Sequence, residues 1–272
     1  MICYNSDITT GVMILDIQNE IIKKLNSYES EQNIRILHAV ESGSRAWGFA
    51  SPDSDYDVRF IYIHNKDWYL KLEKTRDVLE LELNDVYDIN GWDIQKFFRL
   101  LHNSNPTAFE WLNSPIVYTT HPIIAEMSPQ INLFFSRKSG LYHYLNAAKS
   151  NYKNYIENKH KVKLKKYFYV LRPLLACDWI LSHKTSPPVL FSDLLNAIKT
   201  DDNFYDAIQR LIIQKQTVNE IEIIDRIPVL EEYINSEFSE IKFSLDTMED
   251  DKNKDWELLN EMFLKCLDQY NN

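Results

Sequence analysis

Hydrophobic residues in the first hundred positions follow two different spacings. Over residues 12–25, apolar side chains recur every three or four positions with charged residues between them, which predicts an amphipathic helix. The polar residues 27–33 predict a loop. Short apolar, β-branched runs predict strands over residues 34–40, 57–63, 78–83 and 86–89. Asn90-Gly91 is expected to break the chain before a helix over residues 92–102.

Helical spacing dominates beyond about residue 104. A helix is expected to start at Asn105-Pro106, and the clearest helical pattern covers residues 162–181 and ends before Ser186-Pro187-Pro188. Further helices are predicted over residues 211–224, 230–245 and 256–267. The pattern therefore predicts an α+β protein, in which a small mixed sheet with helices precedes a helical C-terminal half. Prolines between residues 113 and 130 favour two domains, 1–115 and 116–272.

Composition narrows the class of protein. A hydrophobic content of 44% is typical of a globular protein and excludes a disordered chain. The formal net charge of −10 repels bulk nucleic acid, so any contact with nucleic acid would need a local basic patch. The acidic excess fits a site that needs cations, and it fits equally well a surface that only keeps the protein in solution.

The cysteines and the hydropathy pattern bear on location. Cys3, Cys177 and Cys266 are far apart and form no CxxC motif, which favours a reducing compartment over a disulfide scaffold or a zinc site. We find neither a signal-peptide pattern nor an apolar stretch of membrane-spanning length. We therefore expect a cytoplasmic protein with no membrane partner.

Candidate chemistry concentrates in residues 41–63. Asp55 and Asp57 lie two positions apart at the start of a predicted strand, so their side chains are expected to share one face. Two adjacent carboxylates repel each other unless a cation neutralises them, and Mg²⁺ prefers oxygen ligands. Two such ions about 3.5–4 Å apart can stabilise both the attacking and the leaving oxygen of phosphoryl transfer. Arg59 shares this face and is expected to pair with a carboxylate when no metal is present.

Gly43-Ser44 supplies a second element. A strand that ends in Gly-Ser before a helical turn leaves backbone N–H groups and a hydroxyl for phosphate oxygens, although the P-loop pattern is absent. Asp-x-Asp and Gly-Ser are each common and carry little information alone. The order of strand, Gly-Ser, turn, and Asp-x-Asp opening a second strand is far more specific.

The stretch Gly-Ser-Arg-Ala-Trp-Gly-Phe-Ala-Ser-Pro-Asp-Ser-Asp-Tyr-Asp-Val-Arg resembles the DNA polymerase β-like nucleotidyltransferase superfamily. Within it, the sequence is similar to a bacterial and phage group of predicted nucleotidyltransferases, some of them linked to RNA repair. Asp88-Ile-Asn-Gly-Trp-Asp93, Glu110-Trp111-Leu112 and Arg172-Pro173-Leu174 extend the resemblance over roughly residues 34–190.

The resemblance implies a mechanism and a set of roles. Asp55 and Asp57 would bind Mg²⁺ or Mn²⁺, with two ions expected, and a nucleoside triphosphate. A third carboxylate on a neighbouring strand would be a ligand and help to activate the attacking hydroxyl. Asp88 is preferred for this role, because residues 86–89 are predicted to form the needed strand. Asp93 is the alternative, although it could instead be a carboxylate in the first turn of the following helix, where the helix dipole favours a negative charge. Gly43, Ser44 and Arg45 would contact phosphates, although Arg45 could equally be a surface residue.

A dense basic run follows at Lys159, Lys161, Lys163, Lys165 and Lys166. It could hold the triphosphate or an RNA phosphate chain, or it could be a solvated helix face. From the resemblance, Lys166 and Arg172 are the expected nucleotide-binding residues. The acceptor could be an RNA end, a protein side chain or a small molecule, with RNA slightly favoured. The alternative function is a non-catalytic nucleotide sensor or an antitoxin-like interaction protein.

Overall fold

A mixed sheet organises the N-terminal half of the protein. The computed structural model describes residues 6–198, 201–219 and 221–270, and it describes residues 6–15 by their backbone alone. The strands of this sheet are β1 Arg35–Glu41, β2 Tyr56–Ile63, β3 Val78–Leu83, β4 Tyr87–Asp93 and β5 Val117–Thr120. Within the described residues they pair in the order β3–β4–β2–β1–β5. β2 runs parallel to β4, and the other neighbours are antiparallel.

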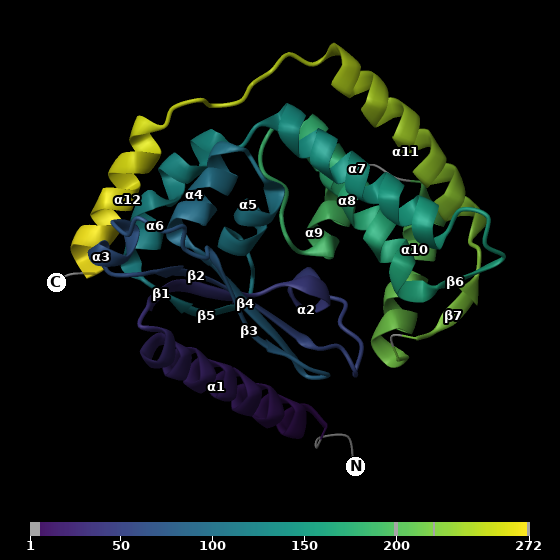
Figure 1. Cartoon of the computed structure of the whole chain (residues 1–272). Coiled ribbons are helices and arrows are strands. Elements are labelled where there is room, and N and C mark those ends of the chain that lie inside the picture. Colours follow the sequence, from purple (N-terminus) through teal and green to yellow (C-terminus); the bar gives the residue numbers. More distant parts are fainter. Residues whose placement is uncertain (1–5, 199–200, 220, 271–272) are drawn as a thin grey trace.

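Successive residues of β2 face opposite layers of helices. Phe60 and Tyr62 are buried with residues of α1 (Ser6–Gln32) on one face. Ile61 and Ile63 are buried on the other face. The helices that cover this second face are α4 Ile94–His102, α5 Pro106–Leu112, α6 Pro122–Ile131 and α12 Glu257–Tyr270. Figure 1 shows α1 alone beneath the sheet and these helices above it. Burial on both faces explains why β2 is almost continuously apolar from Phe60 onward.

Helices form the rest of the C-terminal half. They are α7 Arg137–Tyr155, α8 Leu164–His183, α9 Phe191–Ala197, α10 Asp202–Thr217 and α11 Pro228–Thr247, with the short paired strands β6 Lys161–Lys163 and β7 Ile223–Asp225. Figure 1 places this half on the side where the short helix α2 (Gly43–Trp47) leaves the sheet. Phe49, just after α2, belongs to the core of the helical half and stacks on Phe168 of α8 at a centroid distance of 4.2 Å. The two halves therefore share packed side chains at α2.

The structure confirms the α+β architecture and corrects several boundaries. Residues 27–32, predicted as a loop, continue α1 to Gln32. Asn90-Gly91 does not break the chain, because β4 continues to Asp93. A Cβ atom at Gly91 would collide with the ring of Phe60, so this glycine makes room for an aromatic core side chain within the strand. The predicted helix over residues 92–102 begins only at Ile94, as α4.

Other differences lie toward the C-terminus. The helix predicted over residues 211–224 ends at Thr217, and β7 follows it. The short elements β5 and α3 (Lys66–Tyr69) have no clear periodic pattern and were not predicted. Strand β5 pairs with β1, and α12 packs on the sheet although it ends the described chain. A division at residue 115 stays a prediction, and a unit centred on the sheet would also include β5 and α12.

Two further expectations concern cysteine and hydropathy. Cys177 and Cys266 are buried free thiols, and Cys3 lies outside the described residues. None of the helices in the described part of the chain combines the length and the apolar character that a bilayer span requires.

Candidate active site

Gly43 turns the chain sharply between β1 and β2. Its φ of +59° lies in the left-handed region, which favours glycine. A Cβ atom here would collide with Oδ2 of Asp57 and would lie 2.9 Å from its Cγ. The backbone N–H of Ser42 donates to the carbonyl of Asp57 at 2.8 Å, which ties the turn to β2. The Gly-Ser turn thus lies directly against one of the predicted metal ligands.

Ser44 and Arg45 contact the loop that leads to β2. The Ser44 hydroxyl lies 3.2 Å from Oγ of Ser54. The Arg45 guanidinium donates to the carbonyls of Asp55 at 2.9 Å and Ser54 at 2.6 Å, and it lies 3.8 Å from the centre of the Tyr56 ring. Arg45 therefore braces the backbone of the Asp55 loop. Its predicted contact with phosphate stays a prediction.

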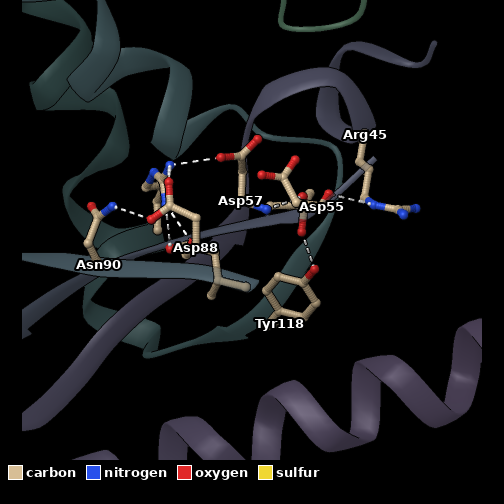
Figure 2. A network of polar contacts seen from close by, with 9 residues as sticks. Arg45, Asp55, Asp57, Asp88, Asn90 and Tyr118 are labelled. Carbon is tan, nitrogen blue, oxygen red and sulfur yellow. Dashed lines mark hydrogen bonds and ion pairs between the residues drawn. The ribbon is translucent and has the colours of Figure 1, made fainter. Parts of the chain in front are cut away.

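Asp57 and Asp88 are brought together by the parallel pairing of β2 and β4, in which they are register partners. One guanidinium nitrogen of Arg59 lies 2.8 Å from Oδ1 of Asp57 and 2.7 Å from Oδ2 of Asp88. Asn90 donates to the other oxygen of Asp88 at 3.2 Å. In Figure 2 the side chains of Asp55 and Asp57 point the same way, with Asp88 on the neighbouring strand. The expected pairing of Arg59 with a carboxylate is confirmed, and Arg59 bridges two of them.

The donor set is compatible with a hard divalent cation. Asp57 and Asp88 already share a positive charge, so the Arg59 guanidinium stands in for a cation between them. Carboxylate oxygens are the ligands that Mg²⁺ takes in proteins. Within the described residues, however, no group of three or more Asp, Glu, His or Cys side chains is arranged to hold a metal ion. Metal binding at Asp55, Asp57 and Asp88 would therefore require side chains to rearrange around Arg59.

Glu41 lies buried at the end of β1, beneath the turn. Its carboxylate accepts from the backbone N–H of Asp57 at 2.8 Å and from the hydroxyl of Tyr118 on β5. Burial raises the pKa of Glu41 to about 7, and both hydrogen bonds oppose this rise. Glu41 is the first of residues 41–63, where the candidate chemistry concentrates, yet its burial could not be inferred from the sequence. It anchors the backbone of Asp57 from the side opposite Arg59.

Asp93 lies elsewhere on β4. It pairs in register with Tyr62, five positions along the strand from the Asp57–Asp88 pair. Its Oδ1 accepts from the backbone N–H of Gln95 and caps α4, while Oδ2 accepts from the Tyr69 hydroxyl at 2.8 Å. The helix-terminus role considered for Asp93 is the one the geometry shows. The alternative prediction, that Asp93 is the third carboxylate beside Asp57, therefore disagrees with the structure, because β4 places Asp93 five residues beyond Asp88.

Lys166 and Arg172 are both on α8 but have different surroundings. Nζ of Lys166 lies 3.8 Å from the ring centre of Tyr155 and 4.4 Å from that of Tyr169, whose ring contacts Trp47 of α2. Arg172 is 4% exposed and its guanidinium pairs with Glu110 at 2.9 Å. Among the described residues its Nε has no hydrogen-bond partner, and the guanidinium lies 4.7 Å from the ring centre of Trp47 of α2, so its predicted nucleotide-binding role stays a prediction.

One basic residue near the Gly-Ser turn was missed. Lys215 of α10 is 2% exposed, and its Nζ donates to Oγ of Ser51 at 2.5 Å. Ser51 lies three residues before Ser54, the hydroxyl partner of Ser44. A lysine 164 positions from its serine partner leaves no local signal in the sequence.

The family model RlaP, described as the RNA repair pathway DNA polymerase beta family, matches residues 17–265. The chain belongs to this family. The matched range includes the Gly-Ser turn, all four candidate aspartates, the lysine run and most of α12. The resemblance inferred from the motif is therefore confirmed at the level of the family.

Two individual proteins are also similar. The uncharacterized protein YcgL of Bacillus subtilis strain 168 is 40% identical over 253 residues, which cover 93% of this chain and 97% of YcgL. The solved structure of a nucleotidyltransferase-like protein from Exiguobacterium sibiricum 255-15 aligns with 84% of this chain and 75% of its own, at 15% identity and a TM-score of 0.31. At these values the structural likeness is distant and carries no argument about the site.

Proposed function

We propose that this protein is a metal-dependent nucleotidyltransferase, which transfers a nucleoside monophosphate from a nucleoside triphosphate to a hydroxyl group. The observation that carries the proposal is the convergence of Asp57 and Asp88 on one cationic group, beside the Gly43-Ser44 turn. Membership in a DNA polymerase beta family supports the reaction class. Divalent metals are general among nucleotidyltransferases, and the carboxylate donor set suits them.

Each polar residue then has a defined task. Asp55, Asp57 and Asp88 would hold the two expected Mg²⁺ or Mn²⁺ ions, once Arg59 no longer bridges Asp57 and Asp88. When bound, the metal neutralises phosphate charge and the charge that develops during transfer. The Ser44 hydroxyl donates a hydrogen bond to a phosphate oxygen. Gly43 keeps the turn close enough to Asp57 for the phosphates and carboxylates to meet.

The transfer itself makes one bond and breaks another. The acceptor oxygen attacks the α-phosphorus of the nucleotide, and the bond from that phosphorus to the bridging oxygen of the β-phosphate breaks. The bridging oxygen keeps the electron pair and leaves as part of pyrophosphate. Asp88 takes the proton of the acceptor hydroxyl, acting as the general base. Asn90 positions Asp88 for this role through its 3.2 Å hydrogen bond.

RNA is the acceptor that we favour. The lysine run borders a hollow of about 450 Å³ that Tyr155 also lines. Lys166 also lines this hollow and contacts the ring of Tyr169, which in turn contacts Trp47 of α2, the short helix that contains Gly43 and Ser44; the hollow is thus a basic surface with aromatic rings beside it. Such a surface suits the phosphates and bases of a single strand. Asp225 partly neutralises it by pairing with Lys161 at 3.5 Å. The family description adds weight, since it places the family in RNA repair.

A second candidate function is nucleotide binding without transfer. The observation in its favour is the Arg59 bridge, which satisfies Asp57 and Asp88 without any metal. A protein of this kind would act as a nucleotide sensor or as an antitoxin-like partner. It would bind triphosphate and change its contacts without releasing pyrophosphate.

A labelling experiment separates these functions. The purified protein is incubated with each nucleoside triphosphate labelled at the α-phosphate, with Mg²⁺ or Mn²⁺, and with RNA, protein or small hydroxyl acceptors. The Asp55→Ala/Asp57→Ala double variant and Asp88→Asn are run in parallel. Asp85→Asn is the matched control, because Asp85 is an exposed aspartate three residues before Asp88.

We expect label transfer to RNA by the wild-type protein and by Asp85→Asn, with loss of at least about 100-fold in the other variants. Transfer that survives the double substitution would exclude the mechanism. Triphosphate binding with no transfer to any acceptor would favour the sensor. Transfer to protein or to a small acceptor would keep the reaction class but reject RNA as substrate.

A further inference from the structure

A chain of buried hydroxyl groups connects α10 with the Gly-Ser turn. Nζ of Lys215 lies 2.5 Å from Oγ of Ser51, Oγ of Ser51 lies 3.0 Å from Oγ of Ser54, and Oγ of Ser54 lies 3.2 Å from Oγ of Ser44. Lys215, Ser51 and Ser54 are 2%, 3% and 5% exposed. The helical half thus reaches a predicted phosphate-binding hydroxyl through two serines that lie away from solvent.

The direction of the first hydrogen bond is fixed by chemistry. An ammonium group has donors and no acceptor, so Oγ of Ser51 must accept from Lys215. The Ser51 hydroxyl proton is then directed to Oγ of Ser54, which also accepts from the backbone N–H of Ser51 at 3.1 Å. In this structure the Ser44 hydroxyl donates to Ser54; because a hydroxyl both donates and accepts, this hydrogen bond can reverse so that Ser54 donates to Ser44.

A phosphate oxygen accepts hydrogen bonds, so the last hydroxyl of this series, that of Ser44, must act as the donor to it. We infer that Lys215 is a positioning residue, which acts through Ser51 and Ser54 to direct the Ser44 hydroxyl proton toward a phosphate oxygen of the nucleoside triphosphate. With the triphosphate bound, each group donates to the next, from Lys215 to Ser51, Ser54, Ser44 and the phosphate. Hydrogen bonds that point the same way polarise and strengthen one another in a buried setting. This inference rests on the proposed nucleotidyltransferase function.

The loop that carries these serines is docked on the helical half at more than one point. Phe49 stacks on Phe168, and Gln216 of α10 donates to the carbonyl of Gly48 at 3.5 Å. Gln216 neighbours Lys215 on the same helix and touches the same loop, but it is exposed and outside the hydroxyl chain. It therefore supplies a control for loop docking that leaves the chain of hydroxyls intact.

The test is a double-mutant cycle on triphosphate affinity. The dissociation constants of all four nucleoside triphosphates with Mg²⁺ are measured by calorimetry for the wild-type protein, Lys215→Met, Ser44→Ala and the double variant. Ser51→Ala breaks the chain while keeping the lysine, and it carries the test if Lys215→Met does not fold. Gln216→Met is the control. Thermal unfolding is recorded for every variant.

We expect Lys215→Met and Ser51→Ala each to weaken triphosphate binding about tenfold, as loss of one charge-assisted hydrogen bond predicts. In the Ser44→Ala background, Lys215→Met should change affinity by less than about twofold, because coupled residues are not additive. Gln216→Met should bind as the wild-type protein does. A purely structural lysine would lower affinity equally in both backgrounds, and that outcome, or unchanged affinity in Lys215→Met and Ser51→Ala, would overturn the inference.

Failure of the function on which the inference rests gives a different result. If the wild-type protein binds none of the four triphosphates, the proposed function is rejected and the role of Lys215 falls with it. If the wild-type protein binds triphosphate and the cycle shows no coupling, only the role of Lys215 is rejected.

Discussion

Asp57 and Asp88 share one guanidinium nitrogen of Arg59, which lies 2.8 Å from the first carboxylate and 2.7 Å from the second. Their register pairing on parallel strands places the two carboxylates close together, where they would repel without a cation. Arg59 supplies that cation from the same strand as Asp57. Arg59 therefore allows the two adjacent carboxylates to stay close together in the folded protein without a further cation.

Removing Arg59 should show whether its guanidinium and a divalent cation compete for Asp57 and Asp88. In Arg59→Met, without divalent cations, we expect the free energy of unfolding to fall by about 1–3 kcal/mol, because two half-buried carboxylates lose their partner. Mg²⁺ should then stabilise the variant more than the wild-type protein, since it no longer competes with Arg59. Urea unfolding in chelator and in Mg²⁺ measures both effects.

The control is Arg76→Met, which removes an exposed arginine paired with Glu80 on the protein surface. This change should alter neither the stability nor the response to Mg²⁺ by more than about 0.5 kcal/mol. An equal Mg²⁺ stabilisation of Arg59→Met and the wild-type protein would contradict metal binding between Asp57 and Asp88.

Gly43 should tolerate no side chain. Gly43→Ala places a methyl group against the Asp57 carboxylate and holds alanine at a φ of +59°, so we expect transfer to fall about 100-fold and stability to fall by about 1–2 kcal/mol. Gly48→Ala is the matched control, because its φ is +89° but its Cβ would meet Leu190 at 3.3 Å and not a site residue. Label transfer and urea unfolding measure the pair. Equal loss of activity in both would point to general strain instead of displacement of Asp57.

We expect Asp93 to influence how the free energy of unfolding depends on pH, and to have little influence on catalysis. Burial raises its pKa from 3.8 to about 6, so the folded state holds the proton more tightly than the unfolded state. The stability due to this proton is fully present below pH 3.8 and is lost as pH rises through about 6. Asp93→Asn should therefore gain stability over the wild-type protein between about pH 4 and pH 7, by up to about 3 kcal/mol.

Asparagine can still accept from the backbone N–H of Gln95, so α4 keeps its cap in this variant. We expect label transfer by Asp93→Asn to stay within about threefold of the wild-type rate, as for other changes outside the reacting groups. Unfolding at a series of pH values and the transfer assay test the two parts separately. Loss of transfer in a stable Asp93→Asn protein would restore Asp93 as a candidate third carboxylate.

The local pattern of hydrophobic residues was enough to predict much of the fold. The strands β1, β2 and β3 were predicted within one residue of their bounds. Most residues of β1 and β2 are buried and therefore form nearly continuous hydrophobic segments, whereas β3 is partly exposed and alternates leucine with glutamate. Errors arose where local chemistry and packing disagree. Asn90-Gly91 has turn-like chemistry, but Gly91 is required by the ring of Phe60 on the neighbouring strand. Polar residues 27–32 continue α1, because a polar surface does not end a helix that already packs on the sheet.

The sequence by itself determined the family and the core of the candidate site. Gly43-Ser44, Asp55 and Asp57 lie within fifteen residues, and their spacing is enough to predict a turn between two strands. Only the tertiary structure showed that Asp88 lies beside Asp57 and Asp93 does not, since the parallel register of β2 and β4 pairs Asp57 with Asp88 and Tyr62 with Asp93. It also buried Arg172 against Glu110 and placed Lys215 beside Ser51. These pairs join residues 62 and 164 positions apart, and contacts at such separations are set by how whole elements pack, which no local pattern records.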